Sequence, residues 1–75
     1  MNIPSIDLDK TGQRIKQARI NSGLSINEVK ETLGFMNPQC IYRWEKGKTV
    51  PTIDNLVAIA RLYGVKVDDL IATIN

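Results

Sequence analysis

A short stretch in the middle of the chain carries the side chains best suited to binding chemistry. If residues 38–46 form a helix, one face carries four polar or charged side chains: Gln39, Tyr42, Arg43 and Lys46. Ile41 and Trp44, three residues apart, then point to the interior. Amide, guanidinium and ammonium groups on one exposed face suit a polyanionic partner. Charges on helix surfaces are also commonly just solvated, and charge alone leaves both interpretations open.

The charge is unevenly distributed along the chain. The sequence has ten basic and eight acidic residues, a net charge of +2. Residues 10–50 carry eight basic and three acidic groups, whereas residues 1–9 carry two acidic groups and no basic one. Residues 51–75 carry two basic and three acidic groups. The cations therefore gather around the helix face described above, which is the electrostatic footprint expected of a protein that binds a polyanion.

The residue types that are missing exclude several kinds of site. There is one cysteine, Cys40, and no histidine, which excludes an internal disulfide, a zinc finger, a histidine general base and a Cys–His nucleophile pair. The sequence has no phosphate-binding loop, nucleophile elbow or paired carboxylates, so we expect no enzyme activity, metal or cofactor. No apolar run reaches the roughly 20 residues that span a bilayer, and residues 1–9 do not resemble a signal peptide. We therefore expect a cytoplasmic protein without a membrane partner or small-molecule ligand.

These side chains need a scaffold, and 75 residues suffice for a single small domain. Without a disulfide or metal, helix-on-helix packing is the remaining route to a stable core. Four glycines separate segments of helical length and suit left-handed helix ends: Gly23, Gly34, Gly47 and Gly64. The pattern predicts an all-α fold over residues 1–75. We expect an N-terminal arm over residues 1–8 and helices over residues 10–22, 26–33, 38–46, 53–63 and 67–73.

Capping residues mark where the first three helices begin. Asp9 and Thr11 are both candidates for the cap of the first helix, and the sequence does not choose between them. Ser25 and Glu28 have the spacing of a capping box for the second helix. Asn37 is followed by a proline, which is typical of the start of a helix at residue 38.

The fourth predicted helix, capped by Thr52, has a wide apolar face. Its inner stripe is expected to contain Ile53, Leu56, Val57, Ala60 and Tyr63. Ile59 and Leu62 widen this stripe, which indicates either a central position or a second buried contact.

Several short motifs follow one another in a fixed order over about residues 11–71. They read Gly12-Gln-Arg-Ile-Lys-Gln-Ala-Arg19, Gly23-Leu-Ser-Ile-Asn-Glu-Val29, Ile41-Tyr-Arg-Trp-Glu-Lys-Gly47, Val50-Pro51-Thr52, Leu62-Tyr-Gly-Val65 and Asp69-Leu70. Their order and spacing closely resemble the Cro/repressor-type (XRE-like) helix-turn-helix family of phage and bacterial regulators. The resemblance implies a compact five-helix, lambda-repressor-like domain whose second and third helices form the helix-turn-helix. It also implies a repressor of the phage or mobile-element kind that binds double-stranded DNA as a homodimer, on half-sites about one helical turn apart.

The resemblance assigns roles to individual residues of this chain. It implies that the third helix reads bases in the major groove with Gln39, Arg43 and Tyr42. Glutamine can pair with adenine and arginine with guanine, and tyrosine can contact a thymine methyl group or a phosphate. It implies that DNA phosphates are contacted by Asn37, Lys46, Lys48 and Thr49. Arg19 and Glu45 are expected to form a structural ion pair between the first and third helices. Lys16 and Lys30 are expected to be merely solvated.

The chain departs from the family pattern at three places. Lys30 stands where alanine is usual, and Ile26 stands where a polar phosphate contact is common. The connection between the second and third helices is also one residue longer than the commonest pattern, which could shift the side chains that reach the bases. A second function remains open: an antitoxin-like module that binds a partner protein. Ile59, Leu62 or residues 71–74 could supply its apolar surface, or could serve homodimerisation instead.

Overall fold

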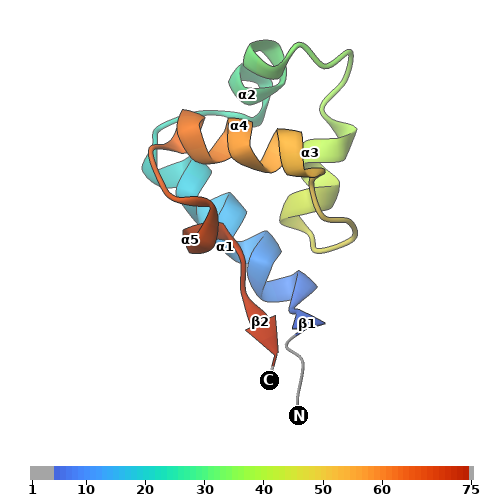
Figure 1. Cartoon of the computed structure of the whole chain (residues 1–75). Helices are drawn as coiled ribbons and strands as arrows, with labels where there is room; N and C mark the ends of the chain where they lie inside the picture. Colours follow the sequence, from blue (N-terminus) through green and yellow to red (C-terminus); the bar gives the residue numbers. More distant parts are fainter. Residues whose placement is uncertain (1–4, 75) are drawn as a thin grey trace.

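The computed structural model describes residues 5–74 and arranges them as five helices and one short two-stranded ribbon. The elements are β1 (Ser5–Ile6), α1 (Leu8–Asn21), α2 (Ile26–Leu33), α3 (Gln39–Glu45), α4 (Ile53–Tyr63), α5 (Val67–Leu70) and β2 (Thr73–Ile74). In Figure 1, α4 crosses α1, and the ribbon lies at the end of the molecule where both termini are found. The predicted five-helix fold is confirmed, and the ribbon is an addition that the sequence analysis did not anticipate.

The first helix begins earlier than predicted. Its cap is Asp7, whose Oδ1 accepts a hydrogen bond from the Lys10 amide at 3.0 Å, so neither Asp9 nor Thr11 has this role. The Asp7 amide in turn donates to the Ala72 carbonyl at 2.8 Å. This contact with the end of the chain holds Asp7 in the extended conformation that a cap requires. The predicted arm over residues 1–8 is therefore wrong for residues 5–8, while residues 1–4 lie outside the described part of the chain.

The middle helices begin close to where their capping residues predicted. The Ser25 hydroxyl accepts from the Glu28 amide and the Glu28 carboxylate accepts from the Ser25 amide, at 3.1 and 3.0 Å, so the capping box is confirmed. Thr52 caps α4 as expected. Helix α3 spans residues 39–45 rather than 38–46, because Pro38 occupies the cap position and only its carbonyl joins the helix, accepting from the Tyr42 amide. The four glycines named above all have left-handed φ angles of 71–79°.

The fifth helix is shorter than predicted. It ends at Leu70 instead of Thr73, and Ile71 is extended. The side chain of Thr11, 2% exposed, both donates to the Ala72 carbonyl at 3.3 Å and accepts from the Ala72 amide at 3.0 Å. Because α1 satisfies these backbone groups from 61 residues away, the chain leaves the helix there and continues as β2, antiparallel to β1.

All five helices contribute to one core, formed by Ile15, Val29, Ile41, Trp44, Leu56, Ile59, Ala60, Tyr63 and Leu70. The buried stripe of α4 differs from the prediction. Ile53 is 79% exposed and Val57 is 40% exposed, whereas Ile59 is completely buried. The helix is rotated so that residues 56, 59, 60 and 63 face inward, which removes Ile59 as a possible docking surface. Among the described residues, no helix is long and apolar enough to cross a membrane.

Candidate nucleic-acid interface

The orientation of α3 is fixed by its buried face. Ile41 is fully buried and Trp44 is 4% exposed. Phe35, in the turn before the helix, packs edge-on against the Trp44 ring, with ring centroids 5.9 Å apart. Next to it, Met36 is 97% exposed. The turn between α2 and α3 is therefore anchored by one of its two apolar residues and leaves the other in solvent.

The opposite face of α3 is open to solvent. Gln39, Tyr42 and Arg43 are exposed on this face, and the exposed Lys46 continues it at the C-cap of the helix. With about 100° of rotation per residue, they occupy an arc of roughly 100° on the helix surface. Gln39 and Arg43 lie on one side of this arc, and Tyr42 and Lys46 on the other. The structure thus brings these four predicted residues together on one surface.

The three other residues expected to contact phosphates flank α3. Asn37 precedes the helix, and its Oδ1 accepts a hydrogen bond from the Gln39 amide at 3.1 Å, so this side chain holds the helix start. Lys48 and Thr49 follow the helix, and their amides donate to the Arg43 carbonyl at 2.9 and 3.5 Å. The Lys48 side chain is exposed and Thr49 is half-buried.

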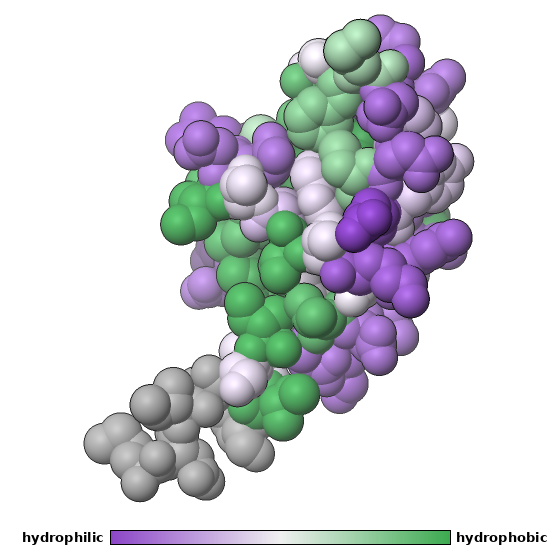
Figure 2. All heavy atoms as spheres, turned by 90° about the vertical axis from the view of Figure 1, so that its right-hand side faces the viewer, coloured by the Kyte–Doolittle hydropathy of each residue, from purple (hydrophilic) through white to green (hydrophobic). Residues whose placement is uncertain are grey.

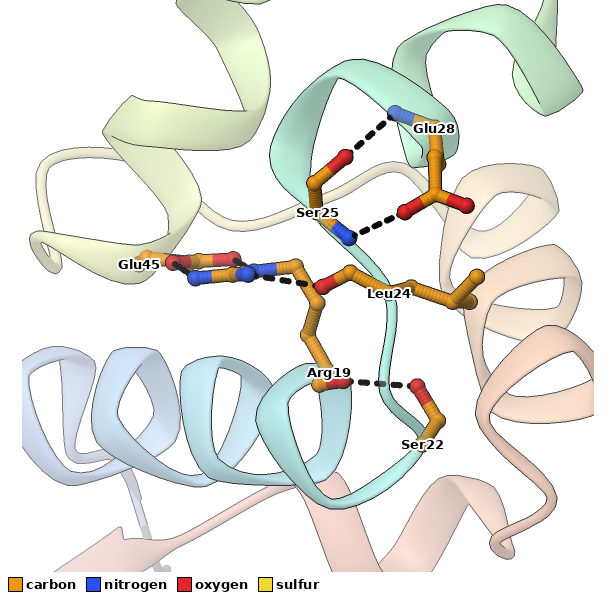
Figure 3. Close-up of polar contacts among 6 residues, drawn as sticks. All are labelled: Arg19, Ser22, Leu24, Ser25, Glu28 and Glu45. Carbon is orange, nitrogen blue, oxygen red and sulfur yellow. Dashed lines mark hydrogen bonds and ion pairs between the residues drawn. The ribbon is translucent and has the colours of Figure 1, made fainter.

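An ion pair joins α1 to α3. Arg19 Nε lies 2.7 Å from Glu45 Oε2, and Arg19 Nη2 donates to Glu45 Oε1 at 3.2 Å. The remaining terminal nitrogen donates to the Leu24 carbonyl at 2.9 Å, so the guanidinium also holds the segment before α2, as Figure 3 shows. The two side chains are only 12% and 5% exposed. The hydrogen bond that Arg19 donates to Glu45 raises the pKa of Arg19 above its ordinary value, although burial opposes the shift.

The backbones of α1 and α3 approach each other closely. A Cβ atom on Gly12 would lie 2.7 Å from the carbonyl oxygens of both Trp44 and Glu45. Gly47, which ends α3 with φ +73°, would clash in the same way with Leu8 and Asp9. Only glycine fits at these contacts, so both residues fix the position of α3 on α1.

The structure also reveals a pocket that the sequence analysis missed. It has a volume of about 330 Å³ and lies where α1, the start of α2 and α3 meet, lined by Lys16, Arg19, Ile26, Tyr42, Glu45 and Lys46. Lys16, expected to be merely solvated, therefore stands beside two of the α3 side chains. Lys30 is instead half-buried, with its Nζ 3.3 Å from Glu31. The motif that contains Lys16 gave this residue no role, because only the packing of α1 on α3 brings its side chain to the pocket.

Figure 2 turns the α3 side of the molecule toward the viewer. Hydrophilic residues gather along one side of this face, and hydrophobic ones gather toward the end that carries β1 and β2. Exposed apolar residues of that end are Ile6, Leu8 and Ile74. Within residues 5–74 no cluster of side chains could hold a metal ion. The polar part of this face is suited to binding a partner through hydrogen bonds and charge.

Comparisons with known proteins agree with this geometry. A family model described as helix-turn-helix matches residues 15–70. The HTH-type transcriptional activator BcrR of Enterococcus faecalis is 27% identical over 60 residues, which make up 80% of this chain but only 29% of that protein. The DNA-binding domain of BldD is similar in structure, with a TM-score of 0.73, 26% identity, and coverage of 87% of this chain and 93% of that one. The restriction-modification controller protein C.AhdI from Aeromonas hydrophila gives a TM-score of 0.74 at 25% identity, covering 85% of this chain and 96% of that one.

Proposed function

The chain belongs to the Cro/repressor-type helix-turn-helix family of DNA-binding transcription regulators, and we propose that it recognises a specific duplex sequence by placing α3 in the major groove. One observation carries this proposal: the polar face of α3 is exposed while Trp44, on the opposite face, is buried in the core. A helix held in this way can enter the groove without any change in the fold.

In the proposed complex, Gln39 and Arg43 read base edges. They are one helical turn apart on the same side of the exposed arc, so they can reach successive bases along the groove. Glutamine makes two hydrogen bonds to adenine and arginine makes two to guanine. Lys46 and Lys48 bind phosphates, and together with Asn37 and Thr49 at the two ends of α3 they set the position of the helix on the duplex.

We further propose that two copies bind together, acting in the cytoplasm as a repressor of the phage or mobile-element kind. Two-fold symmetric binding predicts a palindromic site with half-site centres about 10 base pairs apart. One relative is named a transcriptional activator, so the sign of regulation needs its own measurement. A reporter gene placed downstream of the selected site should lose expression when the protein is supplied, and increased expression would identify an activator.

Selection of bound duplexes from a random pool tests the recognition proposal directly. We expect enrichment of one palindromic consensus, and two protein chains per duplex by analytical ultracentrifugation. Enrichment of a non-palindromic sequence bound by one chain would contradict the dimer, and no enrichment at all would contradict sequence recognition. A variant with both Gln39 and Arg43 changed to alanine is the control, because it should remain folded and select no consensus.

A further inference from the structure

The pocket between α1 and α3 is electrostatically positive. Arg19 and Glu45, which both line it, neutralise each other, and both carboxylate oxygens of Glu45 accept hydrogen bonds from the guanidinium. The remaining charges in the lining are the ammonium groups of Lys16 and Lys46. Glu28, near the start of α2, does not line the pocket, and its carboxylate accepts a hydrogen bond from the Ser25 amide. Neither lysine forms an ion pair within residues 5–74, so the pocket offers an anion two ammonium groups and the phenol of Tyr42.

The pocket lies on the flank of α3, where a DNA backbone would run if α3 occupied the major groove. An α-helix with its side chains is about 10–12 Å across and the major groove is about 12 Å wide. A helix lying in the groove thus has a sugar–phosphate backbone along each flank. Tyr42 and Lys46 form the flank of α3 that turns toward α1, away from Gln39 and Arg43. Lys16 reaches the same place from α1, and Ile26 closes the pocket on the side of α2.

We propose that this pocket binds one phosphodiester group of the DNA backbone, held by Lys16, Lys46 and the Tyr42 hydroxyl. This inference rests on the proposed function and adds to it a phosphate contact from α1. It also changes the role of Tyr42, which positions the protein on the backbone and does not read a base. Ile26 stands where relatives often have a polar side chain that contacts a phosphate. Its own side chain is apolar, so the contact is made by Lys16, Lys46 and Tyr42 in the same pocket.

The first experiment measures the salt dependence of Lys16→Gln on the duplex selected above. Each neutralised phosphate contributes about 0.9 to the slope of log affinity against log salt concentration. Because Lys46 still faces the phosphate, we expect the variant to lose part of this slope, up to about 0.9. The affinity ratio of wild type to variant should then shrink by up to about 3.5-fold between roughly 50 and 200 mM salt. Matched and mismatched duplexes should weaken equally. Lys66→Gln, the same change on an exposed residue before α5, is the control and should keep the slope. An unchanged slope for Lys16→Gln would overturn the proposal.

The second experiment identifies the phosphate. Single neutral methylphosphonate groups are placed along the duplex, and at one position the substitution should weaken binding of the wild type more than binding of Lys16→Gln. Equal weakening of both proteins at every position would contradict the proposal. Inorganic phosphate is titrated in parallel: saturable shifts of the Lys16 and Lys46 signals in nuclear magnetic resonance, without any methylphosphonate effect, would show a site for a free anion instead.

Tyr42→Phe tests the third ligand. Its affinity should fall for all sequences alike, with the base preference kept. A changed preference at one base pair would show that Tyr42 reads a base and would overturn its place in the phosphate site. If the wild type selects no duplex at all, the proposed function fails; if it does select one and Lys16→Gln behaves like Lys66→Gln, only the phosphate pocket fails.

Discussion

The two faces of α3 differ in almost every physical property, although the helix has only seven residues. The inner face packs Ile41 and Trp44 into the core and holds Glu45 against Arg19. The outer face carries polar side chains that are exposed to solvent. Substitutions on the inner face should therefore change the free energy of unfolding, while those on the outer face should change DNA affinity alone. Four sets of variants test this separation between buried and exposed positions.

Glu45→Ala should strongly destabilise the domain. The change leaves the guanidinium of Arg19, 12% exposed, without its carboxylate. Removal of one partner of a buried ion pair costs about 3–5 kcal/mol, which is comparable to the whole stability of a domain of this size. Thermal unfolding followed by circular dichroism should show an unfolded or barely folded chain at room temperature. A melting temperature within a few degrees of the wild type would contradict a structural role for the pair.

Gly12→Ala should destabilise the domain by about 1–3 kcal/mol, the usual cost of overpacking a close contact. The added methyl group would lie 2.7 Å from two carbonyl oxygens of α3, so the two helices would have to move apart. In an exposed helix the same substitution stabilises by up to about 1 kcal/mol. Urea unfolding therefore distinguishes the two effects: overpacking lowers the free energy of unfolding, whereas a gain in helix propensity raises it. Gln13→Ala, at the exposed neighbouring position, is the matched control and should leave stability nearly unchanged.

Arg43→Ala should leave the melting temperature unchanged and reduce discrimination at one base pair. A bidentate arginine–guanine contact contributes about 1–3 kcal/mol to discrimination against other bases. Lys48→Ala should instead weaken all sequences about equally and reduce the salt slope by about 0.9. Binding titrations against a set of single-substitution duplexes separate the two patterns. Equal loss on all duplexes for Arg43→Ala would show that Arg43 binds the backbone.

Tyr63→Phe should have the smallest effect near neutral pH. The Tyr63 hydroxyl is buried and has no hydrogen-bond partner among the described residues, so its removal breaks no hydrogen bond there and should change the free energy of unfolding little. At high pH the difference in stability between the wild type and Tyr63→Phe grows. Burial raises the pKa of Tyr63 to about 12 from an ordinary 10, and the folded state thus favours the neutral phenol. This preference stabilises the folded state fully below pH 10, and the stabilisation is lost as pH rises through 12.

The wild type should therefore lose stability relative to Tyr63→Phe over this range of pH. Urea midpoints of the two proteins at several pH values measure the difference, because every other ionisable group is common to both proteins. Tyr42→Phe, which removes a tyrosine hydroxyl from an exposed position, is the control. A pH dependence equal for both variants would show that burial of Tyr63 is not its cause.

Much of the fold could be predicted because its signals are local. The capping box of α2 joins residues three positions apart, and the spacing of Ile41 and Trp44 fixes which face of α3 is buried. The outward face carrying Gln39 and Arg43 follows from the same periodicity. For α4 the periodicity was ambiguous: seven apolar positions covered more than half of the helix, and the prediction chose Ile53 and Val57 as buried although both are exposed.

The sequence by itself determined the presence of the five helices, the capping of α2 and α4 and the polar face of α3, because these depend on interactions within about one helical turn. Only the tertiary structure decided where α1 begins, where α5 ends and why position 12 must be glycine. Each of these depends on a contact between distant segments, such as Thr11 with Ala72. The same holds for Lys16, which joins Tyr42 and Lys46 in one pocket only because α1 packs against α3. Local spacing encodes which residues share a helix face, but the convergence of side chains from different helices is set by how their backbones pack.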